Sequence, residues 1–127
     1  MSNQIVHFEI IGREPGALRE FYRSLFGWQA DTGAQVAPEV SDAGDYGFID
    51  AAPAQSGVPG GIGGGAGFAP HALFYVGVDD VETALDQAER LGGKRMLGPA
   101  ENPNGAVVVG HFSDPEGNLI GVAAPRK

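Results

Sequence analysis

The chain has 127 residues, a formal net charge of −8 and no cysteine. That length suits one domain, and the hydrophobic content of 43% is enough to build its core. The acidic balance and the scattered Lys and Arg exclude a nucleic-acid surface, and the missing cysteines exclude disulfides, thiolate zinc sites and cysteine nucleophiles.

The first residues carry no secretion-signal pattern, and no apolar run has the length of a membrane span. We therefore expect a cytoplasmic protein that works without a membrane.

Residues 5–11 predict a strand with His7 and Glu9 on one face. Weaker strands are predicted at 28–37, 45–52 and 58–63. The residues from Pro15 to Gly27 predict a helix, whose apolar side chains recur at helical spacing: Leu18, Phe21, Tyr22, Leu25 and Phe26.

The second half repeats this order. Residues 71–78 predict a strand, and residues 80–91 predict a helix with Asp79 and Glu82 spaced as a capping box. Its predicted inward side chains are Val81, Ala84, Leu85, Ala88 and Leu91. A hairpin is predicted from 94–101 and 106–112 around the turn 103–105, and 118–124 closes the set.

The two halves align with each other. A shift of 66 residues superposes the helices and places Glu9 on Tyr75, and a shift of 60 places Gly61 on Gly121. We therefore predict an α+β fold of two tandem βαβββ units, 1–63 and 71–127, joined by 64–70. The glycine-rich run from Val58 to His71 lacks the Lys and Ser or Thr of a phosphate loop, so it is interpreted as a closing strand followed by the connection.

Three stretches resemble the vicinal oxygen chelate superfamily, which includes glyoxalase I, extradiol dioxygenases, and bleomycin- and fosfomycin-resistance proteins. They are "FYRSLFGW" at the end of the first helix, "VDDVETALDQAERLGG" at the second, and "FSDPEGNLIGV" near the end of the chain. The resemblance implies a U-shaped mixed sheet around a pocket, with the helices on its outer face. In enzymatic members, one residue from each of four strands holds a divalent metal.

Carried onto this sequence, those four metal positions are His7, Leu73, Gly61 and Gly121. One imidazole, one alkyl chain and two glycines do not make a catalytic metal site, which needs three or more protein ligands. We therefore expect no metal and no other cofactor. A shifted site built from His7, Glu9 and His71 stays open as the alternative.

The resemblance and the missing ligands together favour a small-molecule-binding protein without the usual metal. The pocket is predicted to be walled by His7, Glu9, Phe48, Gly61, His71, Leu73, Tyr75 and Gly121, with the glycines leaving room for a partly aromatic ligand. The alternative is a lyase, isomerase or dioxygenase with an atypical metal site, or with acid–base chemistry by Glu9 and His7. Short chains of this kind expose sheet edges, so a homodimer is also expected. The sequence does not identify the ligand.

Several residues also have a structural interpretation. His7 is expected to be a partly buried, hydrogen-bonded histidine, and Glu9 to be hydrated at the mouth of the cavity. His111 is interpreted as a surface residue at a strand end. The aromatic residues Trp28, Phe48 and Tyr75 are expected in the core or in the pocket wall.

Overall fold

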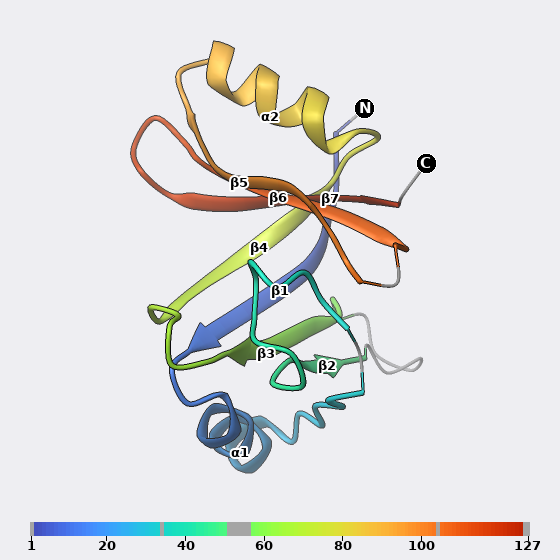
Figure 1. Ribbon diagram of the computed structural model, residues 1–127, viewed down its shortest axis with the longest axis vertical. Coiled ribbons are helices and arrows are strands. Elements are labelled where there is room, and N and C mark those ends of the chain that lie inside the picture. The colour runs from blue at the N-terminus through green and yellow to red at the C-terminus, as the bar shows by residue number, and fades with distance from the viewer. Residues whose placement is uncertain (1, 34, 51–56, 104, 126–127) are drawn as a thin grey trace. The chain divides into compact units, whose positions relative to one another are not determined.

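The computed structural model describes residues 2–33, 35–50, 57–103 and 105–125, and within them the chain forms seven strands and two helices (Figure 1). The chain divides into two compact units. The N-terminal unit is His7–Ala72, and the C-terminal unit combines Met1–Val6 with Leu73–Lys127. The second strand-and-helix repeat thus folds with the first six residues of the chain.

The N-terminal unit holds β1 (Ile5–Gly12) from His7 onward, together with α1 (Pro15–Phe26), β2 (Gly47–Ile49) and β3 (Gly60–Gly64). β3 pairs parallel with β1 and antiparallel with β2, so the predicted closing strand at 58–63 is confirmed. Helix α1 starts with Pro15 in its first turn and ends at Gly27, whose left-handed backbone lets its N–H bond to the Arg23 carbonyl.

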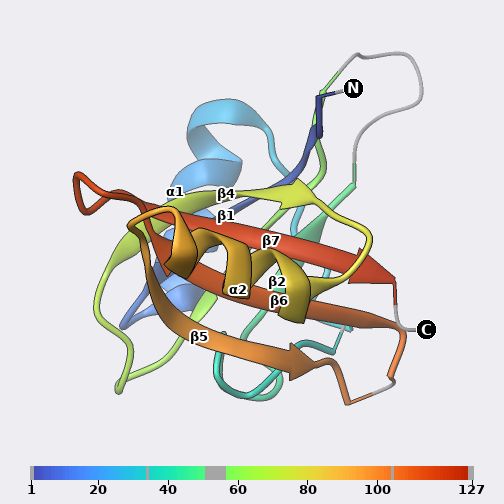
Figure 2. The ribbon, with the colours of Figure 1, turned by 90° about the horizontal axis from the view of Figure 1, so that it is seen from above.

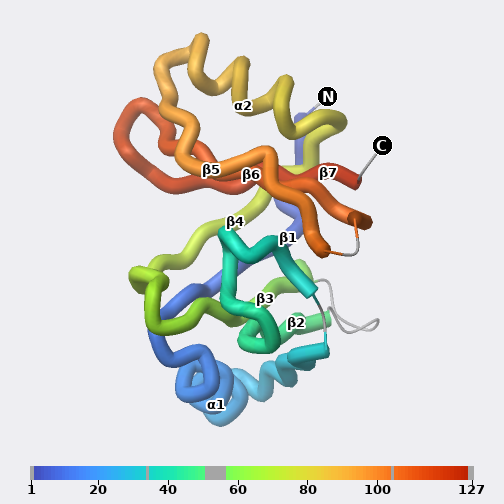
Figure 3. Tube along the Cα trace, in the orientation of Figure 1, coloured from blue at the N-terminus to red at the C-terminus, as the bar shows by residue number. Residues whose placement is uncertain are grey.

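The described residues of 28–37, which exclude residue 34, do not form the predicted strand. Among them only Asp31 pairs, in an isolated bridge with Phe48, and the Asp31 carboxylate then accepts the backbone N–H of Gly33. Such a turn leads the chain out of the extended conformation, and it continues irregularly toward β2 (Figure 3). The predicted strand at 45–52 shortens to β2, and its residues 51 and 52 lie outside the described part of the chain.

The C-terminal unit contains β4 (His71–Gly77) from Leu73 onward, α2 (Val81–Arg90), β5 (Lys94–Glu101), β6 (Val107–Ser113) and β7 (Leu119–Pro125). The strands follow the order β4-β7-β6-β5, with β4 parallel to β7 and the other pairs antiparallel. Helix α2 lies across β6 and β7 (Figure 2), and its buried Val81 and Leu85 form a core with Val122 and Ala124.

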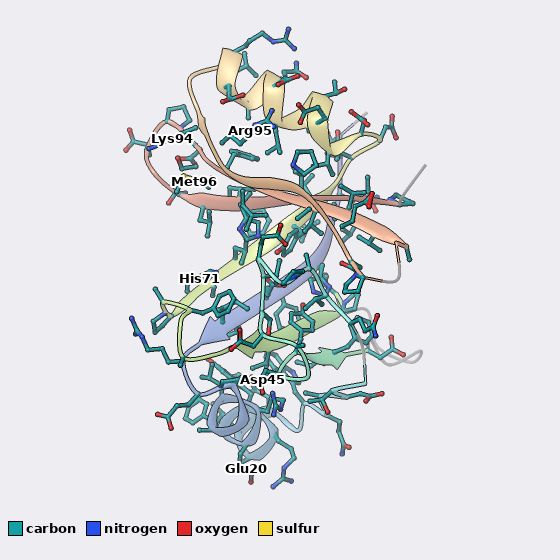
Figure 4. The ribbon with its side chains drawn as sticks, viewed as in Figure 1. Glu20, Asp45, His71, Lys94, Arg95 and Met96 are labelled. Carbon is teal, nitrogen blue, oxygen red and sulfur yellow. The ribbon has the colours of Figure 1, made fainter. Side chains whose placement is uncertain are left out.

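Two details of α2 differ from the prediction. The N-cap is Asp80, whose carboxylate accepts the Thr83 N–H at 2.9 Å, so the capping box of Asp79 and Glu82 is wrong. Leu91 follows the last helical residue and is 73% exposed, because the chain leaves the helix before Leu91 can join its apolar face. Arg95 of β5 points to α2 and forms ion pairs with Glu82 and Asp86, which join the helix to this strand (Figure 4).

Replacing Asp80 by alanine is expected to lower the free energy of unfolding by about 1 kcal/mol, because the first turn of α2 loses the acceptor of one backbone N–H. Asp79→Ala is the matched control, since the Asp79 side chain does not cap the helix. Urea unfolding followed by circular dichroism measures both. Equal losses in the two variants would contradict the assignment of the cap.

Candidate functional site

A hydrogen-bonded trio in the N-terminal unit joins His7 and Glu9 of β1 to Tyr46, which immediately precedes β2. The Tyr46 hydroxyl donates to Oε2 of Glu9 at 2.9 Å and lies 2.7 Å from Nε2 of His7. Since its single proton goes to Glu9, the Tyr46 oxygen accepts from His7, which places the His7 proton on Nε2. Glu9 is only 2% exposed, so its predicted hydration at a cavity mouth is wrong.

Two hydrogen bonds fix the segment that carries Tyr46. The Ser41 hydroxyl accepts the Gly64 N–H at 2.9 Å, which ties the start of the segment to β3. The Arg19 guanidinium of α1 donates to the Asp45 carbonyl at 2.6 Å, immediately before Tyr46. The tyrosine is therefore held by contacts from both the helix and the sheet.

Burial keeps His7 and Tyr46 of the trio neutral. It lowers the pKa of His7 to about 4, so this imidazole carries no charge at neutral pH. Burial also raises the pKa of Tyr46 well above its usual range, and the neighbouring Glu9 charge and hydrogen bond add to the effect. The trio thus combines a carboxylate acceptor with a neutral phenol and a neutral imidazole.

The ring of Tyr46 occupies the space above Gly61. Gly61 of β3 lies between Glu9 of β1 and Phe48 of β2 in the strand register. A Cβ placed on Gly61 would overlap the Tyr46 ring and hydroxyl. Gly61 therefore makes room for a side chain of this protein and not, as predicted from the sequence, for a ligand.

The C-terminal unit repeats this arrangement. Gly121 of β7 lies between Tyr75 of β4 and His111 of β6, and a Cβ on Gly121 would overlap the Tyr75 ring. The Tyr75 hydroxyl is 2.7 Å from Nε2 of His111. His111 is buried in the middle of its strand, so its prediction as a surface residue is wrong. Each unit thus has a tyrosine above the glycine of its closing strand, hydrogen-bonded to a histidine.

The structure divides the predicted pocket residues between the two units. His7, Glu9, Phe48 and Gly61 gather in the N-terminal unit, where His7 is half-buried and hydrogen-bonded as predicted. Its ring stacks with Phe48 at 6.2 Å between centroids and 12° between planes. The buried Leu73, Tyr75 and Gly121 belong to the C-terminal unit. A pocket walled by the whole set stays a prediction.

His71, at the start of β4, bonds through Nδ1 to the Ala69 carbonyl at 2.8 Å (Figure 4). Among the described residues, no three His, Asp or Glu side chains gather in a way that would hold a metal ion, so His7, Glu9 and His71 do not form the shifted site. The four metal positions implied by the resemblance do not fit a metal either. Leu73 has no donor atom, tyrosine rings cover Gly61 and Gly121, and Nε2 of His7 bonds to Tyr46.

Neither the role of Tyr46 nor the hydrogen bond between His111 and Tyr75 was predicted from the sequence. A signal existed for each residue. Tyr46 stands two residues before Phe48, at the spacing of side chains that share a face of a strand. Counting outward from the "DPEGN" turn places His111 opposite Gly121, which is the register that β6 and β7 adopt.

The family model of the Glyoxalase/Bleomycin resistance protein/Dioxygenase superfamily matches residues 4–122. No curated protein matches the chain significantly in sequence. In the described part of the chain, no helix is long and apolar enough to cross a membrane.

Solved structures resemble this chain along nearly all of its length. Methylmalonyl-CoA epimerase in complex with methylmalonyl-CoA and NH4+ has a TM-score of 0.65 at 15% identity, covering 98% of this chain and 95% of that one. A variant of the Streptomyces coelicolor epimerase with 2-nitronate-propionyl-CoA has the same four values. A hypothetical protein from Bacillus halodurans C-125 has a TM-score of 0.68 at 13% identity, covering 100% and 97%. At these identities the likeness shows the α+β fold alone.

Proposed function

Since the chain belongs to the Glyoxalase/Bleomycin resistance protein/Dioxygenase superfamily, we propose that it binds a small organic molecule without a resident metal ion. The observation that carries the proposal is the pair of tyrosines above Gly61 and Gly121. Each tyrosine fills the space that a metal-ligating side chain would take at these positions. Tyr46 also bonds to the ring nitrogen of His7, the one remaining metal position with a donor atom.

The residues of the N-terminal unit suit a partly aromatic or heterocyclic ligand. Phe48 and His7 are both half-buried, and their nearly parallel rings offer a surface for stacking. The buried Tyr46 hydroxyl bonds to both His7 and the buried Glu9, so the His7 ring is held in one orientation. Small-molecule sites are lined mainly by apolar and aromatic side chains with a few placed polar groups, and Phe48 and His7 supply both kinds.

The proposal is tested on protein that has been purified without a chelator or an affinity metal. We expect elemental analysis to find far less than one equivalent of zinc, nickel, iron or manganese, and the same metals to leave the melting temperature unchanged. A panel of heteroaromatic compounds is then screened by thermal shift. The binders that it identifies should lose roughly tenfold in affinity on Phe48→Ala, with Met96→Ala as the control on an exposed position of β5. About one equivalent of metal, lost on His7→Ala, would overturn the proposal.

A second candidate function has one observation in its favour. Glu9 is a buried carboxylate linked to Tyr46 and His7, and such a relay suits a general base that moves a proton. Methylmalonyl-CoA epimerase shares the fold, so methylmalonyl-CoA in deuterated water is the first substrate to try. Deuterium incorporation that Glu9→Gln abolishes would favour an acid–base enzyme over a binding protein.

We further propose that the chain forms a homodimer in a cytoplasmic setting. The support for pairing is the exposure of large apolar side chains on α1, which is unusual for a protein that stays monomeric. Light scattering at micromolar concentration measures the mass directly. A mass of one chain at every concentration would contradict the dimer.

A further inference from the structure

The sheet of the N-terminal unit has one face that carries the hydrogen-bonded trio. Glu9 of β1, Gly61 of β3 and Phe48 of β2 are paired in register, so these positions point to the same face. A Cβ on Gly61 would overlap the Tyr46 ring, so Tyr46 covers this face as well. His7, two residues before Glu9 on β1, stacks with Phe48 there. We call this surface the trio face.

Arg19 of α1 lies against the opposite face of the same sheet. Gly47 alternates with Phe48 along β2, and a Cβ on Gly47 would meet the Arg19 side chain. The Arg19 guanidinium then donates to the Asp45 carbonyl at 2.6 Å. The positive charge of Arg19 is therefore held on the side of β2 that is turned away from the Phe48 ring.

The trio face carries negative charge. Glu9 is 2% exposed, so water screens its carboxylate only weakly. Burial keeps His7 and Tyr46 neutral, because it lowers the pKa of the imidazole to about 4 and raises the pKa of the phenol. Residues 31–50, which include Tyr46 and Phe48, contain five acidic residues and neither lysine nor arginine. A ligand that stacks on Phe48 therefore meets a negative potential.

We propose that the ligand of this site is a cationic aromatic or heteroaromatic compound. This inference rests on the proposed small-molecule function and specifies its ligand class. The half-buried rings of Phe48 and His7 stack on the aromatic part of the ligand, and the face of an aromatic ring attracts a cation. The Glu9 carboxylate attracts the same charge, and it repels a ligand that carries a carboxylate or a phosphate.

The test compares three bicyclic probes of similar size and different charge. At neutral pH 1-methylquinolinium is a cation, 4-methylquinoline is neutral and quinoline-4-carboxylate is an anion. Their affinities for the full chain are measured by chemical-shift titration. The cation should bind about tenfold more tightly than the neutral probe, and the anion should bind most weakly. An anion that binds as tightly as the cation would overturn the inference.

Two variants with the same change of charge identify the source of the preference. Glu9→Gln keeps an acceptor for the Tyr46 hydroxyl but removes the charge, so the ratio of the cation affinity to the neutral-probe affinity should fall toward one. Glu39→Gln is the matched control at an exposed position of the same unit. It should change that ratio less than about twofold, because solvent screens an exposed charge. Circular dichroism checks that both variants are folded, and the ranking of the probes in the wild type needs no variant.

The outcomes separate this inference from the proposed function. If the heteroaromatic panel and these three probes all fail to bind, or if Phe48→Ala leaves their affinities unchanged, both are wrong. Probes that bind through Phe48 without a preference for the cation would overturn the ligand class alone. A preference that Glu9→Gln and Glu39→Gln reduce equally would likewise overturn it, since the net charge of the chain would then be the cause.

Discussion

Gly61→Ala is expected to lower the free energy of unfolding by about 3 kcal/mol, because the core around it has no room for a methyl group. The added Cβ would overlap the ring and the hydroxyl of Tyr46. That ring is held by hydrogen bonds to Glu9 and His7, so it does not move aside without breaking them. Urea unfolding measures the loss.

Two comparisons separate this overlap from a general effect of removing glycine. Gly57→Ala should change stability by less than about 0.5 kcal/mol, because a Cβ there meets no atom within 4 Å. In a Tyr46→Ala background, Gly61→Ala should cost much less than it does in the wild type, since the obstructing ring is gone. A Gly61→Ala variant as stable as the wild type would show that Tyr46 does not occupy this space.

The stability of the protein should fall by about 2 kcal/mol between pH 7 and pH 5 on account of His7. The pKa of His7 is about 4 in the folded chain, below its ordinary value of 6.5, so the unfolded chain takes up this proton first. The contribution of neutral His7 is therefore fully present above pH 6.5 and is lost as the pH falls toward 4. The slope reaches at most about 1.4 kcal/mol per pH unit.

His7→Gln isolates this effect, because glutamine can still donate to the Tyr46 hydroxyl but does not titrate. The free energy of unfolding of wild type minus variant, measured at intervals from pH 7 to pH 5, cancels most of the contributions of other titrating groups. The difference should shrink steadily over that range. A difference that stays constant with pH would mean that His7 keeps an ordinary pKa in the folded chain.

The sequence located most elements through local signals. The proline at position 15 and the glycine at position 27 bound α1 because both act on the backbone at their own positions. The β6–β7 hairpin was predictable for the same reason, since its turn is encoded within the "DPEGN" stretch. The strand predicted at 28–37 failed because an extended segment depends on a partner strand, and of its described residues only Asp31 is paired.

The resemblance to the superfamily implied which positions correspond to its metal ligands, and the sequence shows that Leu73, Gly61 and Gly121 have no donor atom there. Only the tertiary structure decided what fills the space above those glycines. Tyr46 comes from an irregular segment fifteen residues before Gly61, and Tyr75 and His111 come from separate strands. Local spacing indicates the strand face of Tyr46 and the register of His111, but it does not encode which ring covers which glycine. Strand pairing places Gly121 between Tyr75 and His111. It places Gly61 between Glu9 and Phe48, and Tyr46 covers Gly61 while its hydroxyl bonds to Glu9, because buried polar groups need hydrogen-bond partners.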